Sequence, residues 1–226
     1  MAGAGAAHTA AAARTGDPYS RALGSGRGPL YLRCADGRVL PLEIERWCAL
    51  PDAADHSVLR RCLGTVLDVG CGPGRIVADL AGRGHRALGV DVHPDAVRRT
   101  RAAGGRALCR SVFDRLPGEG GWDTAVLLDG NIGIGGAPER LLARLVEVVA
   151  PRGLLLVEAA GEDVDERMAV HVCDGRGRCS APFLWARVGL RALAAAAVGS
   201  TGWEVAETWH RGSRCFAALR RAGAAL

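Results

Sequence analysis

The chain has 226 residues, of which 49% are hydrophobic and 23% charged, and its formal net charge is +5 at pH 7. This length fits one domain with short additions, and no apolar run is long enough to cross a bilayer, so we expect a cytoplasmic protein without a membrane part. Its basic residues are all arginines scattered along the chain, which argues against a nucleic-acid partner, because a nucleic-acid groove requires clustered charge and usually stacking aromatic side chains.

The eight cysteines show no spacing typical of a disulfide framework. Cys62 and Cys109 lie beside apolar strand or helix positions, and we interpret the cysteines as small buried side chains in a reducing cytoplasm. A stretch with metal-ligand residue types contains His171, Cys173 and Cys179. It lacks the four ligands and the closely spaced cysteine pair of a zinc site, so we expect no metal.

Residues 1–28 contain mainly Ala, Gly, Thr, Ser and Arg without periodicity, and we expect a disordered tail there. The next block, residues 29–64, predicts a hairpin followed by two short helices. Two strand-like runs flank Asp36-Gly37, a dipeptide typical of hairpin turns. Helical segments are expected at residues 44–48 and 55–62, the second with an aspartate at its N-cap.

A short apolar run rich in β-branched residues, at residues 65–69, leads into a glycine-dense turn and then a helical pattern. This strand, loop and helix open a doubly wound α/β fold. The turn carries an acid and three alternate glycines: Asp68, Gly70, Gly72 and Gly74. The glycines allow a sharp turn and close approach of a ligand. The acid suits a ligand with an ammonium group, and Arg75 stands where a dinucleotide fingerprint needs its third glycine.

This segment resembles motif I of the class I S-adenosylmethionine-dependent methyltransferases. The resemblance implies a doubly wound, mostly parallel seven-stranded sheet with a C-terminal antiparallel hairpin, and an enzyme that uses S-adenosylmethionine as cofactor. It places the methyltransferase domain at residues 65–222, with an acceptor-side insert at residues 159–182. The 29–64 block would then cover the substrate side of the pocket, and the candidates for contact with the acceptor are Tyr31, Glu43, Glu45 and Trp47. For any single one of them, packing on the sheet is the favoured role.

The next two strands supply candidates for the nucleoside end of the cofactor. The strand expected at residues 87–92 ends at Asp91, whose carboxylate can accept two hydrogen bonds from ribose hydroxyls, as it would in NAD-binding proteins too. At the end of the strand expected at residues 106–112, the family usually places an aspartate that accepts from the adenine amino group. Here the matching residue is Ser111, a weaker acceptor, with Asp114 as an alternative.

Residues 122–129 predict a fourth strand, followed by a glycine-rich loop at residues 130–136. Ligands lie beyond the carboxyl ends of parallel strands, so Asp129 and Asn131 should face the position of the reactive methyl group. We expect the loop glycines to let the backbone approach the ligand. The Asn- or Asp-Pro-Pro-aromatic sequence of many amino-methylating enzymes is absent, which argues against methylation of a nucleobase amine or a glutamine.

The remaining chain predicts an amphipathic helix at residues 138–149 and a fifth strand that ends at Glu158. Residues 159–182 read as polar and irregular, and residues 183–198 as a helix. A hairpin at residues 203–220 follows. A terminal antiparallel hairpin distinguishes the methyltransferase sheet from a dinucleotide-binding one.

The resemblance and the strand ends together select a set of cofactor-binding residues. These are Asp68, Gly70, Cys71, Gly72, Gly74, Asp91, Val92, Ser111, Val112 and Asp129. If the acceptor needs deprotonation, four residues are candidate bases, and none is singled out. They are Asp129, Glu158, His171 and His210.

The favoured function is methyl transfer to a small-molecule acceptor. One alternative is an RNA or protein methyltransferase, against which the scattered arginines and the missing amine-methylation sequence count. Another is an NAD-type oxidoreductase, or a protein that binds the nucleoside without catalysis. The sequence leaves the acceptor and the oligomeric state open.

Overall fold

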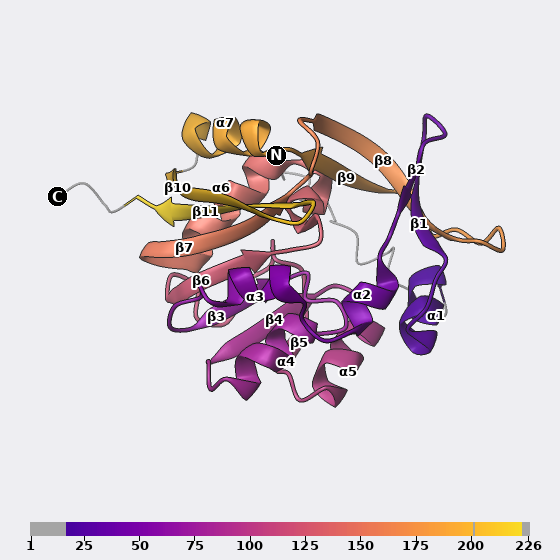
Figure 1. Cartoon of the computed structure of the whole chain (residues 1–226), viewed down its shortest axis with the longest axis horizontal. Helices are drawn as coiled ribbons and strands as arrows, with labels where there is room; N and C mark the ends of the chain where they lie inside the picture. Colours follow the sequence, from indigo (N-terminus) through magenta and orange to yellow (C-terminus); the bar gives the residue numbers. More distant parts are fainter. Residues whose placement is uncertain (1–16, 201, 223–226) are drawn as a thin grey trace, which may run out of the picture.

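The computed structural model describes residues 17–200 and 202–222, whose strands form two sheets (Figure 1). The main sheet has seven strands, five of them mutually parallel, with a C-terminal antiparallel hairpin at one edge. In spatial order the strands are β10 (Trp203–Arg211), β11 (Arg214–Arg221), β7 (Val149–Ala159), β6 (Trp122–Leu127), β3 (Val66–Val69), β4 (Ala87–Asp91) and β5 (Ala107–Cys109). The predicted fold class is confirmed.

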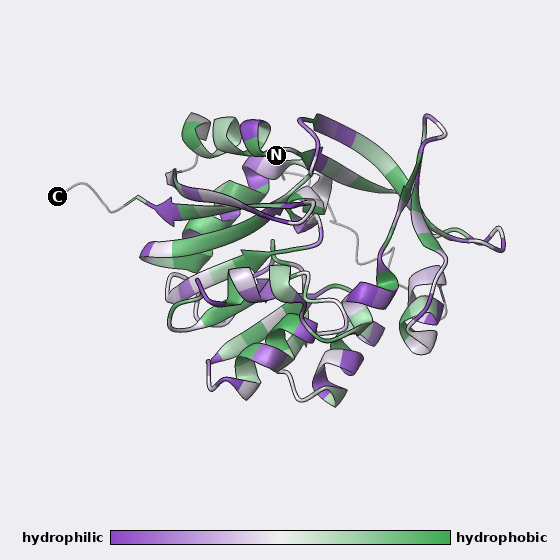
Figure 2. Ribbon diagram, viewed as in Figure 1, coloured by the Kyte–Doolittle hydropathy of each residue, from purple (hydrophilic) through white to green (hydrophobic). Residues whose placement is uncertain are grey.

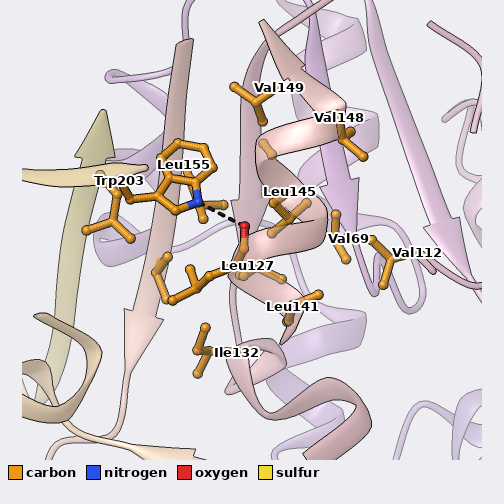
Figure 3. Packing of buried hydrophobic residues seen from close by; sticks show 14 of the residues in the cluster. Val69, Val112, Leu127, Ile132, Leu141, Leu145, Val148, Val149, Leu155 and Trp203 are labelled. Atoms are coloured by element: carbon orange, nitrogen blue, oxygen red, sulfur yellow. Dashed lines mark hydrogen bonds between the residues drawn. The ribbon is translucent and has the colours of Figure 1, made fainter. Parts of the chain in front are cut away.

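Helices cover both faces of the main sheet, because its central strands are apolar on both sides. One face packs against α6 (Pro138–Val148) and α7 (Leu190–Ser200), and the indole of Trp203 donates to the Leu142 carbonyl there (Figure 3). The other face packs against three helices. They are α3 (Ala53–Leu59), α4 (Arg75–Gly82) and α5 (Pro94–Ala102). Figure 2 shows hydrophobic strands at the centre and hydrophilic residues on the outer surfaces of these helices.

A second, four-stranded antiparallel sheet stands beside the main one (Figure 1). Its strands, in spatial order, are β2 (Val39–Pro41), β1 (Leu30–Cys34), β8 (Asp165–Asp174) and β9 (Phe183–Val188). The predicted hairpin is confirmed, since β1 and β2 pair across Asp36-Gly37. The sheet also corrects two expectations. Residues 165–174 form a strand rather than an irregular segment, and residues 183–188 form β9, so the helix begins only at Leu190.

These two errors share a physical cause. The partner of β8 is β1, and in their register Tyr31 lies opposite Cys173. A strand held by a partner so distant in the chain gains its hydrogen bonds from tertiary structure, and local pattern reports this poorly. Phe183 and Trp185 are two residues apart, which places both side chains on one face of a strand, and β8 supplies the partner with which this strand pairs.

The expected disordered tail over residues 1–28 is wrong for its second half, because α1 (Pro18–Ser25) is a capped helix. Asp17 accepts a hydrogen bond from the Ser20 amide at 2.8 Å, and Gly26 ends the helix in a left-handed conformation. Leu23 packs into a small core with Ile44 and its neighbours. The remainder of the expected tail lies outside the described residues.

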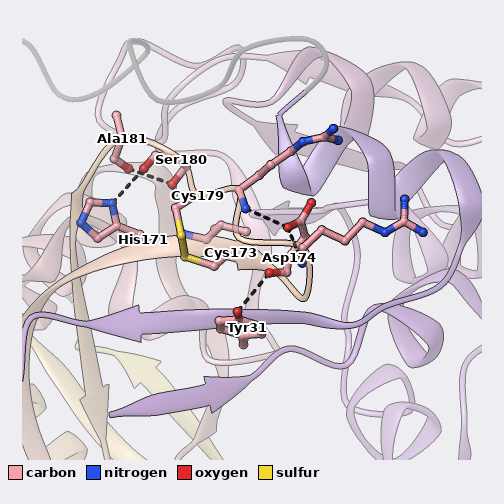
Figure 4. The surroundings of a disulfide bond; sticks show 10 residues. Tyr31, His171, Cys173, Asp174, Cys179, Ser180 and Ala181 are labelled. Carbon is pink, nitrogen blue, oxygen red and sulfur yellow. Dashed lines mark hydrogen bonds between the residues drawn. A yellow bond between two sulfur atoms is a disulfide. The ribbon is translucent and has the colours of Figure 1, made fainter. Parts of the chain in front are cut away.

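Cys173 and Cys179 form a disulfide across the turn between β8 and β9 (Figure 4), which corrects the expectation that no cysteines pair. The hairpin brings the two residues opposite each other. Most of the other cysteines are buried, as expected, although Cys109 is exposed. Among the described residues, no helix is long and apolar enough to cross a membrane.

Candidate active site

A cavity of about 280 Å³ lies where the carboxyl ends of β3, β4 and β6 meet the second sheet. The glycine-rich loop after β3 forms its floor, and α1 and α2 (Ile44–Cys48) contribute to its rim. Parallel strands bring their carboxyl ends to one edge of a sheet, so residues far apart in sequence converge here. The cavity therefore lies where the sequence places the ligand.

The glycine loop is shaped by three left-handed residues, Gly70 (φ 74°), Gly72 (φ 53°) and Gly74 (φ 91°). A Cβ at Gly70 would lie 2.6 Å from Nδ2 of Asn131. That amide donates to the carbonyls of Val69 and Gly70, both at 2.9 Å, and so ties the loop to the end of β6. A Cβ at Gly72 would meet only the hydroxyl of Tyr19, at 3.4 Å. Gly72 is thus the loop residue beside open space, where a ligand can approach the backbone.

Asp91 lines the cavity at the end of β4. One carboxylate oxygen accepts from the amide of Gly72 at 2.9 Å, and the other from the amide of His93 at 2.8 Å. Burial raises the pKa of Asp91, and these two amides partly offset the rise. Each oxygen keeps a second lone pair, so the carboxylate can still accept ribose hydroxyls.

Asp68 lies in β3, is only 3% exposed and does not line the cavity. Its Oδ2 has no hydrogen-bond partner within the described part of the chain. Burial raises the pKa of Asp68 to about 7, Arg75 opposes this rise, and the nearby Asp129 and Asp91 add to it. An unpaired buried carboxyl group is costly, and a cation in the adjacent cavity would relieve that cost. This orphaned oxygen fits a ligand that carries an ammonium group.

At the end of β5 the structure brings Ser111 and Val112 to the cavity wall, together with Phe113. The Ser111 hydroxyl accepts from the Phe113 amide at 3.2 Å, which fixes its orientation. Asp114 is exposed and does not line the cavity. Of the two alternatives for the adenine contact, Ser111 has the suitable position.

Three further members of the predicted cofactor set differ in position. Cys71 and Val92 line the cavity. Gly74 does not, and a Cβ there would lie 2.6 Å from the side chain of Thr100. Gly74 therefore allows α4 to pack closely against α5.

Asp129 follows β6 with φ 56°, a left-handed conformation that is strained for a non-glycine residue. Its carboxylate accepts from Arg46 at 2.8 Å and from Arg75 at 2.6 Å. Its amide donates to Glu158 at 2.8 Å. Both carboxylate oxygens of this candidate base are thus engaged by guanidinium groups, although Asp129 does line the cavity.

Asp129 belongs to a partly buried cluster of charges that we call the charge network. Its members are Arg46, Asp55, Arg75, Asp129, Glu158 and Arg214. Glu158 accepts two hydrogen bonds from Arg214, at 2.7 and 2.8 Å. Burial opposes ionisation of Asp55, but Arg75 and Arg214 outweigh it and lower the pKa of Asp55 to about 2.

The other candidate bases lie away from the cavity wall. Glu158 is held by Arg214 as described, His171 contacts the Ser180 carbonyl through Nδ1 at 2.8 Å (Figure 4), and His210 is exposed on edge strand β10. Sequence reasoning overlooked Asp17, Tyr19 and the apolar residues of the second sheet, which do line the cavity. Their local pattern carries no sign of that role.

The glycines after β6 have a different use from the expected one. The 3-10 helix η1 (Asn131–Gly136) packs on β9. A Cβ at Gly133 would lie 2.8 Å from the ring of Trp185, and one at Gly136 would lie 2.7 Å from Leu184. These two glycines therefore make room for the second sheet, whereas Gly135 lines the cavity.

Comparisons with known proteins found a matching family model and similar structures. A family model described as "Methyltransferase domain" matches residues 66–153. A methyltransferase dependent on S-adenosylmethionine from Bacteroides fragilis, crystallised with S-adenosyl-L-homocysteine, is similar over 91% of this chain and 95% of its own, with 19% identity and a TM-score of 0.76.

Two further structures are similar over three quarters of this chain. The 1,6-didemethyltoxoflavin-N1-methyltransferase of Burkholderia thailandensis has 19% identity and a TM-score of 0.54, covering 75% of this chain and 76% of that one. The sugar N-methyltransferase KedS8 of Streptoalloteichus has 18% identity and a TM-score of 0.57, and the match covers 75% of this chain and 87% of that one. At such identities the likeness is one of fold.

Proposed function

We propose that this chain is a class I S-adenosylmethionine-dependent methyltransferase that methylates a small organic acceptor, since residues 66–153 match a methyltransferase domain model. The observation that carries this proposal is the cavity, which joins the glycine loop to the inner face of the second sheet. A volume of about 280 Å³ between a covering sheet and a helix suits a small molecule better than a macromolecule.

In this proposal, each part of S-adenosylmethionine has its own binding residues. Asp91 holds the ribose hydroxyls, and Ser111 with Val112 contacts the adenine. The loop at Gly70 and Gly72 holds the methionine portion, with the charge of Asp68 favouring its ammonium group. Support comes from the spare lone pairs of Asp91, the open space beside Gly72 and the orphaned oxygen of Asp68.

S-adenosylmethionine, when bound, supplies an already activated methyl group on a sulfonium. The residues of this chain therefore have to align the acceptor and exclude water. Asp129 is held in place by two arginines, and we assign it to positioning rather than to proton removal. Its strained backbone suits a residue fixed for a functional purpose.

The test is ligand-induced stabilisation. S-adenosylhomocysteine at one hundred times its dissociation constant should raise the free energy of unfolding by about 3 kcal/mol, and NAD should leave it unchanged. Stabilisation by NAD alone would favour the oxidoreductase, and stabilisation by neither ligand would refute the cofactor assignment. RNA binding that weakens steeply with salt would indicate an RNA acceptor instead.

A further inference from the structure

The half of the cavity opposite the glycine loop is walled by apolar side chains from the second sheet and α2. We call this surface the acceptor wall, and its residues are Leu32, Leu42, Trp47, Val172, Phe183 and Trp185. Phe183 and Trp185 meet edge to face, with ring centroids 6.1 Å apart. Aromatic walls of this kind favour a flat, apolar ligand.

None of the six residues of the acceptor wall carries a charged side chain. Asp129, the charged residue beside the acceptor wall, is bound by Arg46 and Arg75. Burial raises the pKa of Tyr19 well above its usual value, so its hydroxyl stays neutral. The acceptor wall itself therefore offers neither a counter-ion for a charged acceptor nor a base for a weakly acidic one.

From this arrangement we infer that the acceptor is a flat, largely apolar aromatic molecule whose attacking atom is free of its proton at neutral pH. A pyridine-type ring nitrogen and an aromatic thiolate share this chemistry. The inference rests on the proposed methyl transfer and names the substrate class of that same cavity. Alkylamines, which are protonated at neutral pH, and phenols, with pKa values near 10, would require a base.

The chemical step then needs no proton transfer from the acceptor to the protein. The lone pair of the ring nitrogen or thiolate forms a bond to the methyl carbon, while the electron pair of the sulfur–methyl bond returns to sulfur. With a thiolate, the negative charge and the positive charge of the sulfonium cancel. An apolar wall that excludes water favours such charge cancellation, because water stabilises the separated charges.

Trp47 offers a hydrogen-bond donor to a ligand in the cavity. Its indole N–H is buried and has no acceptor in the part of the chain that the structure describes, although the residue lines the cavity. A buried donor without a partner is unfavourable. A nitrogen or oxygen atom on an aromatic ligand would supply the missing acceptor and orient the ring.

The experiment is a matched panel on benzene, naphthalene and quinoline scaffolds. The nucleophile is a thiol, a ring nitrogen, a phenol or an aminomethyl group, and methyl transfer from S-adenosylmethionine is followed by mass spectrometry between pH 6.5 and 9. We expect the best thiol or ring-nitrogen acceptor to exceed the best phenol and amine at least tenfold in kcat/KM. With ring-nitrogen acceptors, kcat should be independent of pH.

Variants of the acceptor wall test whether the preference among acceptors comes from the wall or from the chemical reactivity of the acceptors themselves. Trp185→Ala should raise KM for the aromatic acceptor about tenfold and leave the affinity for S-adenosylhomocysteine within twofold, and Trp185→Phe should restore most of the loss. If Trp185→Ala fails to fold, Phe183→Ala serves the same purpose. Leu50→Ala is the control, since Leu50 is 89% exposed and lines no part of the cavity.

Preference for phenols or amines, or an unchanged KM in Trp185→Ala, would overturn the inference. Absence of transfer to the whole panel by protein that binds S-adenosylhomocysteine would also overturn it, while leaving the proposed function intact. If calorimetry shows no binding of S-adenosylhomocysteine, the proposed function itself fails.

Discussion

At the scale of single residues, Asp68 gives the protein a pH dependence. Its pKa rises from 3.8 to about 7 on burial, so the folded state binds more protons than the unfolded state between these values. The free energy of unfolding must then fall as pH rises through this interval. Asp55, with its pKa lowered to about 2, acts in the opposite sense but only at more acidic pH.

We therefore expect Asp68→Asn to lack this decline. Relative to wild type, the ligand-free variant should become progressively more stable as pH rises from 4.5 to 7.5, because it has no buried carboxyl group to ionise. Urea unfolding at several pH values measures the difference. A stability difference that stayed constant across the range would show that Asp68 is already ionised in the folded protein.

A second prediction concerns Asp91. Asp91→Ala should weaken S-adenosylhomocysteine binding about tenfold or more, because hydrogen bonds to a charged group contribute about 1.5–3 kcal/mol each, and the loop amide of Gly72 also loses its acceptor. Calorimetry provides the measurement. Asp114→Ala is the matched control, since Asp114 is exposed and off the cavity wall; equal affinities in the two variants would remove Asp91 from the site.

At the scale of elements, the charge network joins the cofactor loop to its surroundings. Arg75 begins α4 and pairs with Asp55 of α3 and with Asp129 after β6. Arg214 of β11 continues the chain of contacts to Glu158 at the end of β7. These contacts fix the ends of elements that are apolar along their lengths, and so they set the geometry of the site.

Removing one member of the charge network should destabilise the fold, because its partners would stay buried without their counter-ion. Arg75→Met leaves Asp55, which is fully buried, without its main counter-ion, and a loss of about 3–5 kcal/mol is expected. Arg83→Met, at the C-cap of the same helix, removes a largely exposed ion pair with Asp79 and should cost less than about 1 kcal/mol. Chemical denaturation of both variants makes the comparison, and similar losses would mean that the network adds nothing beyond a surface pair.

At the scale of the whole molecule, the acceptor wall exists because distant segments pair. The β1–β2 hairpin precedes the main sheet in sequence, and β8 and β9 follow β7. The four strands meet over the carboxyl ends of the main sheet, and a disulfide closes the turn between β8 and β9 (Figure 4). A small core of Leu32, Cys34 and Val170 holds this sheet together.

We expect the double variant Cys173→Ser/Cys179→Ser to lose about 2 kcal/mol of stability, because the cross-link restricts the unfolded chain over a short loop. Reducing agent should bring wild type to the same value and leave the variant unchanged. Urea unfolding of both proteins, with and without reductant, measures these differences in stability. A wild-type protein insensitive to reductant would mean that the disulfide does not contribute.

Much of the main sheet could be predicted from sequence because its information is local. Apolar runs followed by helical patterns indicated the alternating strands and helices, and Asp68 with the glycines after it supplied the prediction of the ligand class. Strand-end acids such as Asp91 follow from the rule that ligands lie beyond the carboxyl ends of parallel strands. Each of these signals lies within a few residues of the feature it describes.

The sequence by itself thus determined the fold class and the edge of the sheet where the cavity lies. Only the tertiary structure decided that β8 pairs with β1, that α1 covers the glycine loop and that Arg46 and Arg75 neutralise Asp129. The physical reason is sequence distance. Strand pairing and buried ion pairs depend on which groups meet in space, and a local pattern cannot specify a partner that lies far away in the chain.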